Sequence, residues 1–187
     1  MNKIKYIVIG GSAGSFRVIT DILDAIPKDF PFTLILVLHR LKHIKTGFIE
    51  ALQPKSELPI IEPDDKEPIL NKKVYIAPAN YHMYIEPDKT FALSTEGVVN
   101  HSRPSIDLTL SSAGYSLKDK VLGIMLSGAN KDGAIGLKHI KENRGITIVQ
   151  SPDDSMVSTM PDAAIKETNT KNILTSQQII EYILNLS

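Results

Sequence analysis

Short apolar runs alternate with helical patterns along most of this chain, and this alternation restricts the fold more than any other feature. The runs at 5–9 and 32–38 are each followed by a helical pattern, and the run at 121–126 begins a second half with the same rhythm. The run at 32–38 is almost continuously apolar, as in strands covered on both faces of a parallel sheet. The sequence therefore predicts a doubly wound α/β fold, with a mostly parallel sheet and helices on both faces.

The same patterns give element boundaries. Helices are expected at 16–26, 46–52, 104–117, 133–143 and 161–168, and further strands at 145–149 and 172–174. The helix at 133–143 is expected to carry Ile135, Leu137 and Ile140. Thr175 and Gln178 form a capping box for a last helix. Short strands are expected at 59–62, 74–78, 83–85 and 90–93, some of them antiparallel, with hairpin turns at 80–82 and 87–89, which predicts a small antiparallel hairpin insertion. We expect residues 1–187 to form a single domain.

Charge and cysteine content exclude several classes of protein. Lys+Arg and Asp+Glu both number 21, so overall charge gives no reason to expect nucleic acid or anionic lipid as a partner. The chain has no Cys, which excludes disulfides and favours a reducing compartment. The first apolar run is too short to span a membrane and lacks a signal-peptide cleavage pattern. These features predict a cytoplasmic protein without membrane insertion.

A glycine-rich turn follows the first predicted strand. In this turn Gly10, Ser12 and Gly14 have the spacing of a nucleophile elbow, which presents a serine hydroxyl between a strand and a helix. The N–H groups just after Ser12 are expected to open the helix, where they are free to bind an oxyanion. A serine here can also bind a phosphate. However, the dinucleotide fingerprint fails at Ser12 and Ser15, and no Gly-Lys-Ser/Thr follows.

Two more strand ends carry reactive side chains. His39 follows the second strand, and Asp132 ends the polar loop after the 121–126 strand. Because function in such sheets gathers at the carboxyl ends of the strands, we expect Ser12, His39 and Asp132 to meet there. Histidine takes the serine proton and aspartate orients the imidazole, which is the arrangement for acyl transfer.

Each of the three residues also has a simpler interpretation. His39 can bind a backbone carbonyl at the strand end, and Asp132 can cap the helix that follows it. The other histidines are weaker candidates. His43 lies in a Lys-rich segment that suits a solvated docking surface, His82 lies in a turn beside the expected cleft, and His101 and His139 are isolated. Since no pair has metal-ligand spacing, we expect no metal site and no cofactor.

Several segments resemble the catalytic domain of the chemotaxis protein-glutamate methylesterases, the CheB family. The matching motifs are Gly10-Gly11-Ser12-Ala13-Gly14, Leu38-His39-Arg40, 74–82, Arg103-Pro104-Ser105-Ile106-Asp107, 126–134 and Met160-Pro161-x-Ala163-Ala164. They occur in the family's order over nearly the whole chain. The chain departs from the usual pattern at Ala13 and Ala129, where many members carry threonine and methionine.

The resemblance implies a function. Ser12 aligns with the nucleophile, His39 with the general base and Asp132 with the residue that orients it. Backbone groups at Ala13, Gly14, Gly128 and Ala129 are the expected oxyanion donors and supports. The implied activity is hydrolysis of glutamate γ-methyl esters on chemoreceptor helices, together with deamidation of receptor glutamines. The family's usual receiver domain is missing from this sequence, so we expect a stand-alone catalytic domain that a separate regulator can control, with a fragment of a larger protein as the open alternative.

Two alternatives remain open at this point. One is a binding or regulatory module that keeps the fold with altered catalysis, and the other is a nucleotide-binding enzyme that uses the glycine turn for phosphate. The failed fingerprints oppose the nucleotide enzyme. The presence of all three triad residues opposes the inactive module.

Overall fold

A computed structural model describes residues 3–39 and 47–186, and its centre is a parallel sheet of seven strands. Their order is β3-β4-β2-β1-β7-β8-β9, and all paired neighbours run parallel. The strands are β1 (Tyr6–Gly11), β2 (Thr33–Leu38), β3 (Ile60–Ile61), β4 (Val74–Ile76), β7 (Val121–Met125), β8 (Ile146–Gln150) and β9 (Ile173–Leu174). The predicted doubly wound α/β fold is thus confirmed.

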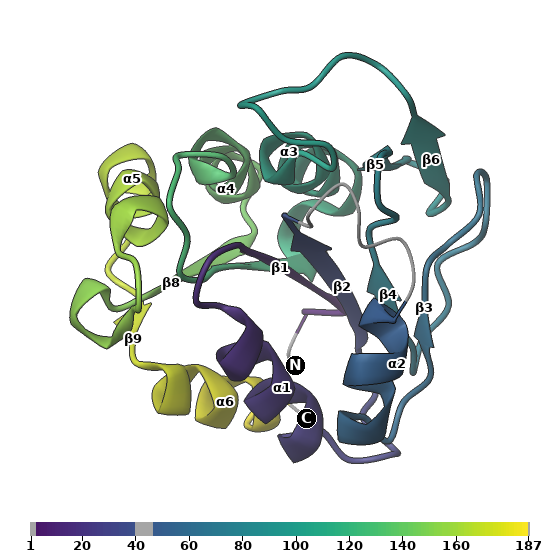
Figure 1. Ribbon diagram of the computed structural model, residues 1–187, viewed down its shortest axis with the longest axis horizontal. Helices are drawn as coiled ribbons and strands as arrows, with labels where there is room; N and C mark the ends of the chain where they lie inside the picture. Colours follow the sequence, from purple (N-terminus) through teal and green to yellow (C-terminus); the bar gives the residue numbers. More distant parts are fainter. Residues whose placement is uncertain (1–2, 40–46, 187) are drawn as a thin grey trace.

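Helices form a layer on each side of this sheet (Figure 1). One layer contains α1 (Phe16–Ala25), α2 (Phe48–Leu52) and α6 (Ser176–Leu184). The other contains α3 (Ile106–Leu117), α4 (Ala134–Glu142) and α5 (Thr159–Thr168). Short 3-10 turns occur at η1 (Gln53–Lys55), η2 (Lys118–Lys120) and η3 (Pro152–Asp154). The predicted capping box is confirmed, because Thr175 and Gln178 bond reciprocally at the start of α6.

Two apolar clusters fill the spaces between the sheet and its helix layers. In β2, Leu34, Leu36 and Leu38 pack toward α1, whereas Ile35 and Val37 pack toward α3. Both faces are therefore buried, which explains why this run is nearly all apolar. A fully buried side chain of this size contributes about 1.5–3 kcal/mol relative to an exposed one.

The small hairpin differs from the sequence prediction. Strands β5 (His82–Ile85) and β6 (Phe91–Ser94) do pair antiparallel through the turn near 87–89. The second hairpin expected at 80–82 is wrong, because β4 pairs only in parallel with β2 and β3. Asn80 has a left-handed φ of 67°, and there the chain leaves the sheet.

Polar side chains of α3 hold β5 in its unexpected position. Thr109 donates to the Met83 carbonyl at 2.6 Å, and Ser112 accepts from Ile85 N at 3.0 Å. Ser116 donates to the Ile85 carbonyl at 2.7 Å. A helix face therefore satisfies the backbone of β5, which no periodicity in the strand could have indicated.

Other boundaries also shift. Helix α3 begins at Ile106, two residues later than expected, with Ser105 as its N-cap. In α4, which carries all three apolar residues expected of it, Leu137 and Ile140 are buried, whereas Ile135 is 52% exposed. The Lys-rich segment that contains His43, and Thr46 at the expected start of α2, lie outside the described residues.

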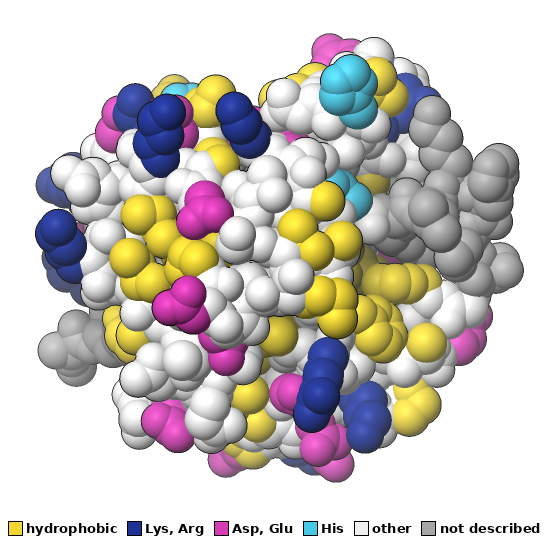
Figure 2. Space-filling view, turned by 60° about the vertical axis from the view of Figure 1, so that its left-hand side comes forward, with side chains coloured by type: hydrophobic (Ala, Val, Ile, Leu, Met, Phe, Trp, Pro, Cys, Tyr) yellow, Lys and Arg dark blue, Asp and Glu magenta, His cyan; other side chains and the backbone are white. Residues whose placement is uncertain are grey.

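The surface carries both signs of charge. On the face in Figure 2, basic and acidic side chains are interspersed, in keeping with the equal counts of the two charge types. In residues 3–39 and 47–186, no helix is long and apolar enough to cross a bilayer.

Candidate active site

Strand register brings Ser12 and His39 together at the carboxyl edge of the sheet. Gly11 of β1 lies opposite Leu38 of β2, and His39 N donates to the Gly11 carbonyl at 3.3 Å. Ser12 and His39 follow at the next position on neighbouring strands, whose spacing is about 4.8 Å. Side chains along a strand alternate between its two faces. By this alternation Ser12 lies on the same face of the sheet as Val8, and His39 on the same face as Ile35. Both side chains are therefore directed to the sheet face that α3 covers.

The turn that presents Ser12 is less strained than the predicted elbow. Ser12 does not have a positive φ, and the left-handed conformation falls on Gly14, with φ +82°. Ser15 donates to the Ser12 carbonyl from its N–H at 3.1 Å and its hydroxyl at 2.7 Å. Helix α1 begins only at Phe16, so Ala13 and Gly14 precede the helix instead of forming its first turn.

The loop after β7 packs directly on this turn. Ser127 donates its hydroxyl to the Ala13 carbonyl at 2.8 Å, and a Cβ added at Gly128 would lie 3.1 Å from the Ser12 Cβ. Gly128 N donates to the Val157 carbonyl at 3.1 Å. Contrary to expectation, the Gly128 N–H is thus occupied and supports the loop. A glycine suits position 128 because a Cβ there would lie 2.6 Å from Met160 Cε and 3.1 Å from the Ser12 Cβ.

Three of the expected oxyanion donors remain available. Within the described part of the chain, the N–H groups of Ala13, Gly14 and Ala129 donate to no protein acceptor. Unpaired N–H groups on two loops beside one hydroxyl are what an oxyanion needs. Ser12 Oγ itself makes no hydrogen bond to His39 among the described residues.

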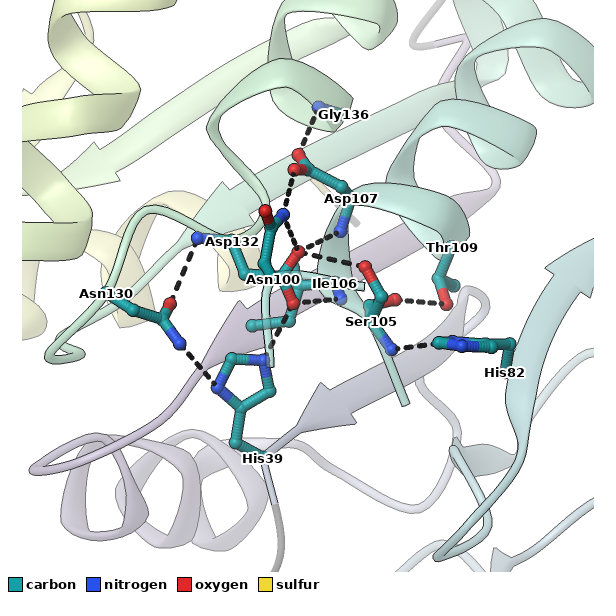
Figure 3. A network of polar contacts seen from close by, with 10 residues as sticks. All are labelled: His39, His82, Asn100, Ser105, Ile106, Asp107, Thr109, Asn130, Asp132 and Gly136. Atoms are coloured by element: carbon teal, nitrogen blue, oxygen red, sulfur yellow. Dashed lines mark hydrogen bonds and ion pairs between the residues drawn. The ribbon is translucent and has the colours of Figure 1, made fainter. Parts of the chain in front are cut away.

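His39 and Asp132 are in direct contact, although they are far apart in sequence. His39 Nε2 lies 2.7 Å from Asp132 Oδ2 (Figure 3). The Asp132 side chain is fully buried, and that of His39 is 12% exposed. Because Nε2 faces the carboxylate, Nδ1 is the ring nitrogen left for proton exchange with a nucleophile.

Asp132 accepts hydrogen bonds from five groups. They are His39 Nε2 at 2.7 Å, Ile106 N at 2.7 Å, Ser105 Oγ at 2.9 Å, Asn100 Nδ2 at 3.0 Å and Asp107 N at 3.1 Å. Two of these donors are N–H groups at the start of α3, so the carboxylate also interacts favourably with the helix dipole. The interpretation of Asp132 as a cap for α4 is wrong, since Gly133 occupies that N-cap with no side-chain hydrogen bond.

These donors determine the charge of Asp132. Burial alone would raise its pKa, but hydrogen bonds from His39 and Asn100 and from the N–H groups of Ile106 and Asp107 lower the pKa below its ordinary value. The carboxylate is therefore ionised at neutral pH despite its burial. An ionised Asp132 can only accept, so the proton between it and His39 resides on Nε2.

A second buried carboxylate lies behind the first. Asp107 accepts from Gly136 N at 2.7 Å, and Asn100 Nδ2 bridges Asp107 and Asp132. Burial raises the pKa of Asp107; the Gly136 hydrogen bond opposes this rise, and the charge of Asp132 adds to it. Asn100 thus lies between the two carboxyl groups and donates to both.

Sequence reasoning missed the polar groups around Asp132. Asn100, Ser105 and Asn130 were not among the candidates, although Ser105 lies in the quoted motif 103–107. His82 is not in a turn beside a cleft. It is fully buried in β5, where Nδ1 accepts from Ser105 N at 3.1 Å. Within residues 3–39 and 47–186, no group of three or more His, Asp or Glu side chains is arranged to hold a metal.

Comparison with known proteins relates this geometry to a family. The CheB methylesterase family model matches residues 7–183. A Leptospira interrogans protein that carries the name of a protein-glutamate methylesterase/protein-glutamine glutaminase is 40% identical over 96% of this chain and 93% of its own length. A Methanospirillum hungatei protein with that name is 38% identical over 86% of this chain and 46% of its own length. The crystal structure of the Thermotoga maritima CheB methylesterase catalytic domain superposes with a TM-score of 0.91 at 30% identity, covering 98% of this chain and 99% of that one.

Proposed function

Because the chain belongs to the CheB methylesterase family, we propose that it hydrolyses glutamate γ-methyl esters on chemoreceptors through Ser12, His39 and Asp132. The observation that carries this proposal is the 2.7 Å contact between His39 and a buried, ionised Asp132, at the sheet edge where Ser12 follows the neighbouring strand β1. We take residues 1–187 as one catalytic domain.

In the first half of the reaction, Ser12 Oγ attacks the γ-carbonyl carbon of the methylated glutamate. Its proton passes to His39 Nδ1, because Nε2 is bonded to Asp132. Asp132 stabilises the positive imidazolium that forms. The bond between the carbonyl carbon and the methoxy oxygen then breaks, and methanol leaves with the proton from Nδ1.

In the second half, water replaces methanol. His39 Nδ1 takes a proton from water, which attacks the glutamyl ester on Ser12, and returns the proton to Ser12 as the free glutamate leaves. The same steps convert a receptor glutamine to glutamate when ammonia is the leaving group. During both attacks, the N–H groups of Ala13, Gly14 and Ala129 are the donors for the carbonyl oxygen.

The surface beside Ser12 suits a helical protein substrate. Phe16 is 45% exposed and Met156 is 80% exposed, and Met156 Cβ packs against Gly14 of the serine turn. Phe16 is held edge-on against Phe48, with ring centroids 5.8 Å apart. We propose that Phe16 and Met156, the apolar rim, contact the apolar side of the receptor helix that carries the ester.

The test is methanol release from a methylated receptor fragment, combined with labelling by a fluorophosphonate probe. The wild-type chain should release methanol and be labelled once, and Ser12→Ala should lose both. Ser94→Ala, on strand β6, is the matched control and should behave as the wild type. Undiminished labelling or turnover in Ser12→Ala would remove Ser12 from the mechanism. The inactive-module alternative is not favoured, since the His39–Asp132 pair is intact.

A further inference from the structure

The side chain of Asn130 lies against the ring nitrogen of His39 that the proposed mechanism uses. Asn130 Oδ1 accepts from Asp132 N at 3.0 Å, and Asn130 Nδ2 lies 3.4 Å from His39 Nδ1 (Figure 3). The backbone N–H of Asp132 can only donate, which fixes the amide oxygen on that side. The NH2 group of Asn130 must therefore face His39.

This orientation restricts where the ring proton can lie. An amide NH2 group only donates, so it can bond to Nδ1 only when that nitrogen has a free lone pair. On the other side of the ring, the ionised Asp132 requires the proton on Nε2. Asn130 and Asp132 thus select the same neutral tautomer from opposite sides, and this tautomer can accept the serine proton.

We infer that Asn130 is a positioning residue, whose amide keeps His39 Nδ1 unprotonated and directed at the serine turn until the Ser12 hydroxyl displaces it. The inference rests on the proposed function. The 3.4 Å separation is longer than the usual range of about 2.7–3.2 Å, so the contact is weak and Ser12 can replace it at small cost.

The same contact affects the proton after its transfer. Once Nδ1 carries the proton of Ser12, the NH2 group of Asn130 offers no acceptor for it. The proton is then more readily given to the departing methanol oxygen than it would be beside a carboxylate. Asn130 thereby keeps His39 from being trapped as an imidazolium.

The competing interpretation is that Asn130 only stabilises its loop, through the bond from its oxygen to Asp132 N. Asn130→Asp separates the two roles, because it keeps that oxygen and replaces the NH2 group by a second oxygen. A loop role predicts nearly normal behaviour of Asn130→Asp. A positioning role predicts a trapped, protonated His39. Asn71→Asp is the matched control, since it makes the same charge change at an exposed turn.

Two measurements test the inference in the full chain. In the first, imidazole ¹⁵N NMR at neutral pH should show the wild-type proton on Nε2. In Asn130→Asp the titration midpoint of His39 should rise by about one pH unit or more, because an acceptor then faces Nδ1. Among the described residues, Asp132 is the one other ionisable side chain bonded to His39, and it is unchanged in this variant. Asn71→Asp should titrate as the wild type.

In the second, kinetics with a methylated receptor fragment should give Asn130→Asp at least a tenfold lower kcat at pH 7. KM should be unchanged, and the acid limb of the kcat/KM profile should move to higher pH. A wild-type proton on Nδ1, or an unchanged His39 midpoint in Asn130→Asp, would overturn the inference. If the NMR result is as expected but the wild-type chain releases no methanol, the proposed function fails while the role of Asn130 in fixing the tautomer stands.

Discussion

Replacing Asp132 by asparagine should damage stability and catalysis by two separable routes. The carboxylate accepts five hydrogen bonds, three on Oδ1 and two on Oδ2. In Asp132→Asn, the amide oxygen is most favourably placed at the Oδ1 position, where three donors converge. The NH2 group then faces the two donors on the other side, Ile106 N and His39 Nε2.

The cost can be estimated from these two contacts. His39 can move its proton to Nδ1 and accept from the new NH2 group, but the Ile106 N–H is left without an acceptor. A buried unpaired donor costs about 1–3 kcal/mol, and losing a negative charge at the start of a helix costs about 0.3–1 kcal/mol. The free energy of unfolding should therefore fall by about 1–4 kcal/mol. For a chain of this length, the middle of that range corresponds to a decrease in Tm of about 5–10 °C.

The change of tautomer has a larger effect on rate. With its proton on Nδ1, His39 cannot accept the serine proton, and in well-studied triads the equivalent change lowers kcat about 10⁴-fold. Urea unfolding followed by circular dichroism gives the free energy, and methanol release gives the rate. Asp29→Asn, at an exposed position, is the matched control and should change neither.

The stability effect should also depend on pH in a defined direction. The pKa of Asp132 is lower in the folded state than in the unfolded state, where it is about 3.9. The contribution of Asp132 to the free energy of unfolding is therefore fully present above the unfolded pKa, and it is lost as the pH falls through the folded pKa. The difference between wild type and Asp132→Asn should be present at pH 7 and shrink below about pH 4. An unfolding free energy within about 0.5 kcal/mol of wild type at pH 7 would contradict the buried network, and a rate loss below tenfold would contradict the role of Asp132 in orienting His39.

Three further substitutions test neighbouring features. Gly128→Ala should lower kcat at least tenfold, because its Cβ would lie 2.6 Å from Met160 Cε and 3.1 Å from the Ser12 Cβ and so would disturb the serine turn; Gly97→Ala, whose Cβ meets nothing within 4 Å, is the kinetic control. Met156→Ser should raise KM for a receptor fragment severalfold at unchanged kcat, whereas Tyr115→Ser, at a residue of α3 that is also largely exposed, should not; equal KM values would remove Met156 from the substrate surface. Thr175→Ala should cost about 1 kcal/mol of stability through loss of the capping box and leave kcat/KM unchanged; a loss of activity would show that α6 communicates with the site.

The parts of this structure that follow from local patterns were predictable. The β1, β2 and β7 strands are mostly apolar and polar residues follow them, so the parallel sheet and the reactive residues at its carboxyl edge could be predicted together. The contact of His39 with Asp132 then follows from topology, because β2 and β7 flank β1 in the sheet. The position of β5 was not predictable, since its partners are hydroxyl groups of α3 instead of another strand.

The surroundings of Asp132 were also beyond sequence reasoning. Asn100 contacts the carboxylate from a loop, where its own φ is 50°. No sequence pattern indicates this contact. Ser105 and Ile106 contribute because α3 begins two residues later than its proline suggests. The choice of Nδ1 as the reacting nitrogen likewise depends on ring orientation, which only coordinates reveal.

The electrostatic character of the site follows from what surrounds Asp132. The ion pairs among the described residues give it no Lys or Arg partner, and His39 is the only basic side chain bonded to it. Its ionisation is sustained by the hydrogen bond from His39 and by further donors that carry no charge: two backbone N–H groups, a hydroxyl and an amide. Such buried dipoles are screened by salt far less than surface charges are. The orientation of His39 by Asp132 should therefore be insensitive to ionic strength, so that any salt dependence of turnover arises from substrate association and appears in KM instead of kcat.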